Sequence, residues 1–436
     1  KGESIELTSA GTGDQHAFVN ASHSAFVDAI SGAAGGKTGV AGHVAVNIVT
    51  GRTLGSYGDN AAITLADGID VGTEVGASTL QADATSYTLT RARPGTAATG
   101  STTGVGLGFA IGYSAYDTDA QISGSATVAG TAGDLSVDAN GDHTVITLAT
   151  AGTGSNGTAV AGAVALGISN NQTDARVLAG ADLEVDGNLT ITADSTLRQT
   201  TEANAEVTGK GKTGVGAAIA LGWAEDDVNA RLERNVSTGT ATANDVKVEA
   251  KGVITATVLS TASAEGEKNA NNGGQTAEQQ TSSQTSFVNT RTNSSLTNPT
   301  PQTQVANANN QSQSQTQNPG GQGNQNANQA TTQTSGGVLR IAASIGGTVI
   351  LSDVSAQIVD GLTIDASGDL SVKAIADTDA QAEAVSLAFT QSSEDSTNVS
   401  AAVAFNVALL DADAYLGNGT TSAGSVAVEA GTTLGQ

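Results

Sequence analysis

The chain has 436 residues, of which 55 are glycine and 3% are aromatic, and it contains neither cysteine nor methionine. Its 17 basic and 42 acidic residues give a net charge of −25. The lack of cysteine excludes disulfides and thiolate sites for metal or redox chemistry, and the negative charge argues against binding to nucleic acid or anionic lipid.

The first predicted strand, residues 5–10, introduces a pattern of aliphatic residues at alternate positions that ends in alanine. A shortened copy follows at 80–82, and full copies stand at 135–139, 189–193, 246–250, 370–374 and 426–430. The same motif therefore stands near both ends of the chain, and we predict that these two copies meet across a boundary between subunits.

A second pattern is an alternating segment that ends in asparagine or glycine. Its copies stand at 44–47, 109–112, 164–167, 219–222, 343–346 and 403–406. One parity carries large side chains such as Val44, Phe109 and Ile219, and the other carries mostly glycine or alanine. We expect the large side chains to fill a core and the small ones to let a neighbouring layer approach closely.

A third pattern, alanine followed two residues later by an aliphatic residue, shows the period most clearly. Its copies begin at Ala120, Ala175, Ala230, Ala356 and Ala414, with steps of 55, 55, 126 and 58 residues. A unit of about 55 residues cannot bury its apolar face alone, so such units must stack on one another.

The one long step coincides with a change of composition between Lys268 and Ser335, where Gln, Asn, Thr and Ser dominate. We therefore predict β-solenoid repeats over 1–265, a Gln/Asn-rich low-complexity insertion at a hairpin tip over 266–336, and further β-solenoid repeats over 337–436. The insertion is either a disordered loop or a segment that orders by pairing with a neighbouring molecule.

These patterns together predict an all-β fold, an elongated β-solenoid or parallel β-helix-like stack of about 55-residue repeats. Alternating segments on both sides of glycine-rich stretches, such as 153–157, are typical of two strands joined at a tip. We expect these pairs to form protruding β-hairpins.

Acidic clusters are the candidates for a metal site, because carboxylates beside glycine turns can bind Ca²⁺. They lie at Asp117/Asp119, Glu225–Asp227, Asp377/Asp379 and Asp411/Asp413. No EF-hand loop is present, so solvated turn residues are the first interpretation and weak Ca²⁺ binding stays the alternative. The four histidines are scattered, which argues against zinc: His16, His23, His43 and His143.

No catalytic constellation stands out in the sequence. Arg176 and Arg231 occupy the same repeat position, which predicts a surface ladder of side chains, and no nucleophile elbow, P-loop or HExxH motif is present. We predict that the protein is not an enzyme, with no catalytic, cofactor-binding or metal-binding residues.

Residues 187–193 and 213–222 resemble the repeats of giant Gram-negative surface proteins, the filamentous adhesins, haemagglutinin-like exoproteins and autotransporter passengers. The resemblance implies a secreted or surface-displayed β-rod in adhesion, biofilm or extracellular matrix. The absence of cysteine fits export through an oxidising periplasm.

We therefore expect an extracellular structural or adhesive rod, acting as an adhesin stalk or as a filament subunit. Its expected partners are further copies, joined end to end through strand edges, and a cell-surface receptor or glycan, with no insertion into a membrane. The alternative is a carbohydrate-binding or carbohydrate-active β-helix that would use an aromatic strip of Tyr113, Tyr116, Trp223 and Tyr415.

Overall fold

The computed structural model describes most of the chain outside the Gln/Asn-rich stretch. The described residues are 5–7, 16–35, 38–58, 62–65, 79–100, 103–124, 127–129, 134–155, 157–185, 187–208, 213–238, 244–265, 339–389 and 397–435. They form strands and turns without any helix, so no helix among them has the length and apolar character needed to cross a membrane.

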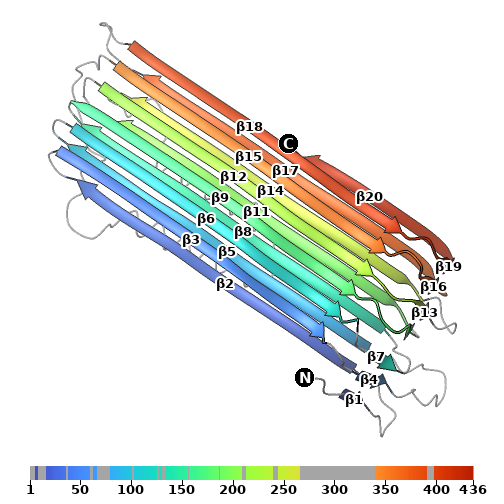
Figure 1. Ribbon diagram of the computed structural model, residues 1–436. Helices are drawn as coiled ribbons and strands as arrows, with labels where there is room; N and C mark the ends of the chain where they lie inside the picture. Colours follow the sequence, from blue (N-terminus) through green and yellow to red (C-terminus); the bar gives the residue numbers. More distant parts are fainter. Residues whose placement is uncertain are drawn as a thin grey trace.

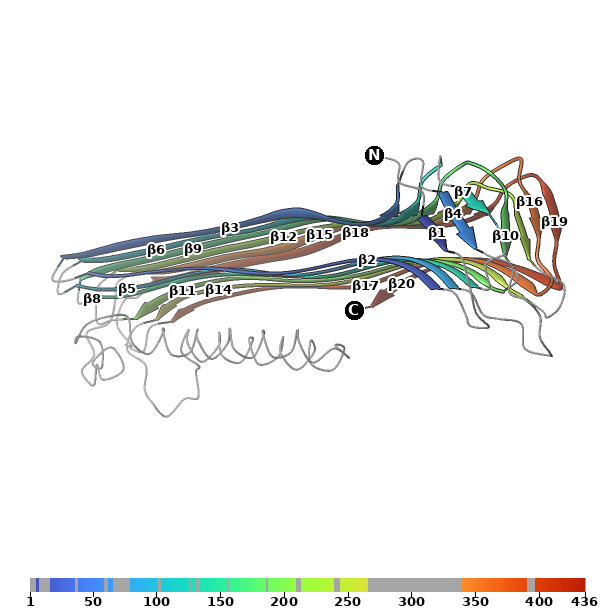
Figure 2. The ribbon, with the colours of Figure 1, turned by 90° about the horizontal axis from the view of Figure 1, so that it is seen from below.

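Two large parallel sheets lie face to face along the whole described chain (Figure 1; Figure 2). Sheet I has seven strands, in the order β2 (His16–Gly35), β5 (Thr79–Gly100), β8 (Asp134–Ser155), β11 (Leu189–Thr208), β14 (Val246–Glu265), β17 (Asp369–Phe389) and β20 (Ser425–Gly435). Sheet II has six strands, in the order β3 (Thr38–Tyr57), β6 (Thr103–Ile122), β9 (Thr158–Val177), β12 (Thr213–Leu232), β15 (Leu339–Ile358) and β18 (Thr397–Leu416).

Short strands gather at one end of the two long sheets, as Figure 2 shows. One short sheet contains β1 (Ile5–Leu7), β4 (Ala62–Leu65) and β7 (Thr127–Ala129). The other contains β10 (Leu183–Val185), β13 (Val236–Thr238), β16 (Thr363–Asp365) and β19 (Thr420–Ser422). Each coil thus runs through sheet I, sheet II and a short strand, and the predicted elongated β-solenoid is confirmed.

Equivalent positions of successive repeats lie side by side in unbroken ladders. Ala120, Ala175, Ala230, Ala356 and Ala414 form one such ladder across sheet II. The long step of 126 residues is also a single coil, since β12 pairs directly with β15 and β14 with β17. The insertion itself lies outside the described residues, between the end of β14 and the start of β15.

The predicted hairpins are wrong, because the two long strands of one repeat belong to different sheets. β8 pairs with β5 and β11, while β9 pairs with β6 and β12. The parallel partners in the neighbouring coils take the ladder hydrogen bonds of both strands, so the two strands of a repeat pack against each other as parts of facing layers. The connection is an arch between two layers.

Two of the predicted motif copies, at 5–10 and 343–346, do not pair with the equivalent residues of the other copies. Residues 5–7 form β1, where Ile5 pairs with Ile63 in a short sheet, so they are not a copy of the motif at 426–430 and give no support to a contact between those two segments. On β15 the partner of Gly222 is Thr348 and not Gly346. A slip of two residues keeps the same face of a strand, which is why the pattern fits both alignments.

The side chains between the two sheets are small over most of their length. Alanines at Ala149, Ala163, Ala203 and Ala218 belong to one buried cluster in which alanine predominates. Nearer the short strands the core becomes aliphatic, with Leu135, Leu183, Leu189, Ile122 and Leu232 buried in a second cluster. The sheets approach closely where the side chains are smallest: a Cβ on Gly106 would lie 2.6 Å from the carbonyl oxygen of Gly152 in the facing sheet.

Candidate functional site

The side chains of sheet II face in the directions opposite to those predicted. Its alanines and glycines face sheet I and most of its aliphatic side chains face outward: Ala45 is 3% exposed, while the adjacent Val44 on the same strand is 61% exposed. The small residues do permit the close approach of the neighbouring layer, as predicted. The large residues at the alternate positions do not fill a core.

The outward side chains form a broad apolar surface, which we call the aliphatic face. It comprises the outward residues from Val40 to Ile48 on β3 and the positions paired with them on the other five strands of sheet II. The register aligns the row of Val40 as Val40, Val105, Val160, Val215, Ile341 and Val399. The row of Val44 reads Val44, Phe109, Val164, Ile219, Ile345 and Val403, and the row of Ile48 reads Ile48, Tyr113, Ile168, Trp223, Val349 and Val407.

The outer face of sheet I is different in character. The outward side chains of β11 are polar: Thr190, Thr192, Asp194, Thr196, Arg198 and Thr200. Of the two outer faces, the aliphatic face is therefore the one suited to bind another apolar surface.

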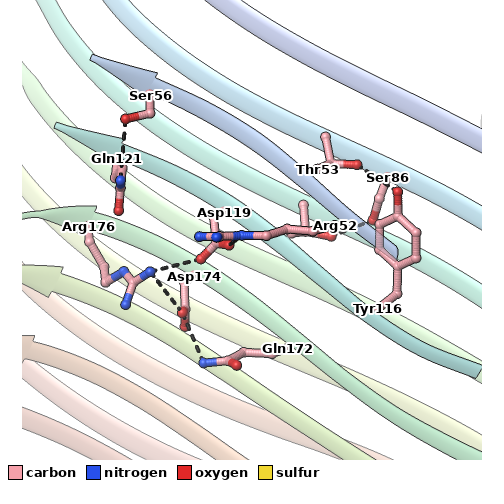
Figure 3. A network of polar contacts seen from close by, with 11 residues as sticks. Arg52, Thr53, Ser56, Ser86, Tyr116, Asp119, Gln121, Gln172, Asp174 and Arg176 are labelled. Carbon is pink, nitrogen blue, oxygen red and sulfur yellow. Dashed lines mark hydrogen bonds and ion pairs between the residues drawn. The ribbon is translucent and has the colours of Figure 1, made fainter. Parts of the chain in front are cut away.

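A polar belt borders the aliphatic face on the side of the short strands, and Figure 3 shows its network of polar contacts around Asp119. Asp119 on β6 accepts from Arg52 on β3 at 2.6 Å and from Arg176 on β9 at 2.8 Å. Arg176 also lies 3.4 Å from Asp174. Arg176 pairs in register with Arg231, which is the predicted ladder position, and Arg231 forms its own ion pair with Glu233 at 2.8 Å.

Replacing Asp119 by asparagine should lower the free energy of unfolding by about 1 kcal/mol, because its arginine partners are partly exposed and screened by solvent. Urea denaturation at low salt measures this loss, which should shrink at high salt. Asp379→Asn is the control, since Asp379 is an exposed carboxylate on β17, in the other large sheet. If both variants lose the same free energy of unfolding, the ion pairs of Asp119 with Arg52 and Arg176 have no special role.

The acidic clusters of the sequence do not come together at one point. Asp227 on β12 pairs in register with Asp353 on β15 and then with Asp411 on β18, so they form a row along the belt. Burial and the neighbouring carboxylates raise the pKa of Asp353. Asp377 lies on β17, in the other large sheet. Within the described ranges, no group of three or more His, Asp or Glu side chains has the geometry to hold a metal ion.

Two histidines that are distant in the sequence meet at Tyr116. The ring of Tyr116 stacks on His23 at a centroid distance of 5.4 Å, and its centroid lies 5.5 Å from that of the tilted His143 ring. His143 is fully buried, with its Nδ1 atom 2.8 Å from Thr88 Oγ1, and burial lowers its pKa to about 3. A neutral, enclosed imidazole of this kind is part of the core. His43 is also buried, on β3, and nothing is described of the side chain of His16.

Asp226 is the buried member of the Glu225–Asp227 cluster and points into the layer between the sheets. Ser195 donates to its Oδ1 atom at 2.8 Å, while its Oδ2 atom has no partner among the described residues. Burial raises the pKa of Asp226 to about 7. The sequence interpretation treated Glu225–Asp227 as one cluster, whereas alternation along β12 places Asp226 on the opposite face from its two neighbours.

The expected aromatic strip does not form. Tyr113 and Trp223 share one row of the aliphatic face, but Ile168 lies between them. Tyr116 is 1% exposed, inside the core, and Tyr415 lies at the polar belt, where it donates to Asp360 at 2.6 Å.

No family model matches the chain, and neither a curated protein nor a solved structure matches it. The geometry itself therefore carries the functional argument. It offers a long stacked scaffold, an outer face of sheet I that is polar along β11 but also exposes Phe26, Val385 and Leu387, and the aliphatic face of sheet II.

Proposed function

We propose that the protein is an extracellular structural or adhesive β-rod, which serves as a stalk or as a subunit of a filament. The observation that carries the proposal is the unbroken parallel pairing of both large sheets across all coils. A strand inside such a ladder bonds to the coil before it and the coil after it, so the chain forms one continuous scaffold. A scaffold of this kind holds surfaces apart or carries them at a distance.

The composition supports an extracellular setting. The chain has no cysteine that an oxidising compartment would modify, and its charge of −25 keeps repetitive β-structure soluble by repulsion. Within the described chain, β18 pairs on one side only, with β15, so its other edge can accept a further parallel strand. Such a strand would come from a continuation of the chain or from another copy.

Immunogold labelling of intact cells of the source organism tests the location, with label on the outer surface as the expected result. Electron microscopy of the purified chain at increasing concentration tests end-to-end assembly, which should lengthen the particles along the direction in which the coils stack. Label confined to the cytosol would refute the extracellular role, and uniform short particles at high concentration would refute the filament. Binding to a glycan array would favour the carbohydrate-binding alternative.

A further inference from the structure

A group of buried polar side chains lies between the two large sheets, near the middle of the stack of coils. Asp226 on β12 pairs in register with Asn171 on β9, and Thr173 follows two residues later on the same face of β9. All three side chains are 0% exposed. From the facing sheet, Ser195 donates to Asp226 Oδ1 at 2.8 Å. We call Asp226, Asn171 and Thr173 the buried polar cluster.

The buried polar cluster contains oxygen atoms that no described residue satisfies. Within the described chain, Asp226 Oδ2, both polar atoms of the Asn171 amide and Thr173 Oγ1 make no hydrogen bond. Burying such atoms without a partner costs free energy, so nearly all of them in folded proteins bind a protein group, a water molecule or an ion. Unsatisfied oxygens at three neighbouring positions therefore indicate a small polar ligand between the sheets.

The groups that face Asp226 carry no charge. On β9 and β15 beside it, and on β11 and β14 around the row of Ser195, the inward side chains within two residues are uncharged. The polar ones outside the cluster are Ser169, Ser195 and Ser352. On β8, the neighbour of β11, His143 is neutral because burial lowers its pKa to about 3. The described strands around Asp226 thus place no lysine or arginine against its carboxylate.

The charge of Asp226 depends on pH near neutrality. Burial raises its pKa to about 7, and the carboxylate of Asp227, which points outward, contributes in the same direction. At pH 8 the folded chain therefore holds mostly an ionised carboxylate without a positive partner in its surroundings. A proton removes this charge at low pH, and a cation can balance it at high pH.

We propose that the buried polar cluster binds one monovalent cation, sodium or potassium, in exchange for the proton of the Asp226 carboxyl. The O–H bond of the carboxyl breaks, the proton leaves to solvent and the cation takes its place, so the net charge of the site stays zero. A divalent cation would leave one uncompensated positive charge in the core, which costs free energy. The single carboxylate therefore favours an ion of charge one.

The spacing of the strands suits such an ion. Neighbouring strands are about 4.8 Å apart, so a cation midway between the in-register side chains of Asp226 and Asn171 would lie about 2.4 Å from an oxygen of each. Carboxylate and carboxamide oxygens bind a hard cation such as Ca²⁺ at about 2.3–2.6 Å. Thr173 adds a hydroxyl oxygen. In the facing sheet, a Cβ on Gly141 would lie 2.8 Å from Thr173 Oγ1, so glycine leaves this hydroxyl its space.

The cation site goes beyond the proposed role as a rod, because it concerns the interior of the middle coils and not the outer faces or the ends. Its failure would leave that role untouched. Its consequence is that the stability of the fold depends on which monovalent cation is present, even when the ionic strength is constant.

Urea denaturation of the full chain at pH 8 tests this dependence. The chain is refolded in about 200 mM sodium chloride, potassium chloride or choline chloride, which screen surface charges equally while choline is too large for the core. We expect the folding equilibrium constant to be about tenfold higher in one of the first two salts than in choline chloride, as for a Kd of about 20 mM. The salt with the larger effect identifies the ion.

The same comparison at pH 5 should show no difference between the salts. With a pKa of about 7, the carboxyl of Asp226 is almost fully protonated at pH 5, so the proton occupies the site. Asp226→Asn should remove the salt difference at pH 8 as well, because the amide carries no charge for a cation to balance. Asp379→Asn, on the outer face of β17, is the control and should keep the tenfold difference.

Thr173→Val tests a second ligand, because valine keeps the shape of the side chain and removes the hydroxyl oxygen. It should reduce the tenfold difference to about threefold or less. Thr348→Val is the matched control, since Thr348 on β15 is also 0% exposed, with an Oγ1 atom that makes no hydrogen bond in the described chain. Thr348 lies four residues before the row of Asp226, so its substitution should leave the salt difference unchanged.

Equal stability of the wild type in the three salts would overturn the proposal. So would a salt difference that persists at pH 5 or in Asp226→Asn, since cations would then act on surface carboxylates only. Equal effects of Thr173→Val and Thr348→Val would also contradict the site. Crystals grown with rubidium chloride give a direct readout: an anomalous peak beside Asp226 is expected, and peaks on the outer surface alone would mean an adventitious ion only and overturn the proposal.

Discussion

Replacing Asp226 by asparagine should stabilise the protein at pH 8 by as much as about 4 kcal/mol, and the gain should disappear towards pH 4. Burial raises the pKa of Asp226 from 3.8 to about 7 in the folded chain. The folded state therefore holds a proton that the unfolded state has released between these two values. The stability that this proton provides is complete below pH 4 and is lost as the pH rises through about 7.

Asparagine fits this position without any rearrangement of the backbone. On β9, Asn171 pairs in register with Asp226 and is itself fully buried between the sheets. The amide of asparagine carries no charge at any pH and can still accept from Ser195, as Asp226 does at 2.8 Å. The substitution removes the cost of burying a charge and keeps the shape of the side chain.

Urea denaturation at pH 5, 6, 7 and 8 measures the effect. The difference between Asp226→Asn and the wild type should grow by about 2–3 kcal/mol from pH 5 to pH 8. Asp117→Asn serves as the control, because this exposed carboxylate is on the outer face of β6. If wild type and Asp226→Asn keep a constant difference over this range, the buried carboxyl does not govern the pH dependence.

The ladders of the solenoid could be predicted because each coil repeats the same residue at the same place. Ala120, Ala175 and Ala230 are separated by equal steps, and equal steps in a stacked fold become neighbours in a sheet. The step across the insertion was equally informative, since Ala230 and Ala356 are also direct neighbours. Spacing alone therefore fixes which strands pair.

The direction of the side chains could not be predicted from alternation. Both parities of sheet II are apolar, one with alanine and glycine and the other with valine, isoleucine and leucine, so either could have faced the core. The facing sheet decides, because its own small residues let the backbones approach until mostly glycine and alanine fit over this part of the layer. One available signal was overlooked: Glu225 and Asp227 share the parity of Leu221, and charged residues mark the solvent side of a strand.

The residues of the turns could not distinguish an arch between two sheets from a hairpin within one sheet. A glycine-rich tip of a few residues can reverse the chain within a sheet or between two sheets, and only the hydrogen-bond partners of the flanking strands differ. For β8 and β9 these partners are the equivalent strands of the neighbouring coils. A period of about 55 residues with two long strands per unit already contained this information, since both strands recur in every unit.

Replacing Gly106 by valine should destabilise the protein by about 3 kcal/mol, the upper range for overpacking a close-packed core. Its added Cβ would lie 2.6 Å from the carbonyl oxygen of Gly152, and that oxygen belongs to the backbone of the facing sheet. A flexible side chain could move aside, but moving this carbonyl would shift β8 within its ladders to β5 and β11. The strain therefore spreads over three strands.

Gly42→Val is the matched control, because Gly42 is on the outer face of the same sheet and a Cβ there meets nothing within 4 Å. Valine favours strands, so this variant should equal or slightly exceed the wild type in stability. Urea denaturation of both variants in dilute protein gives the comparison. Equal destabilisation would mean that glycine is needed for backbone freedom along sheet II, whereas a loss at Gly106 alone shows that the two sheets are held at a distance only glycine allows.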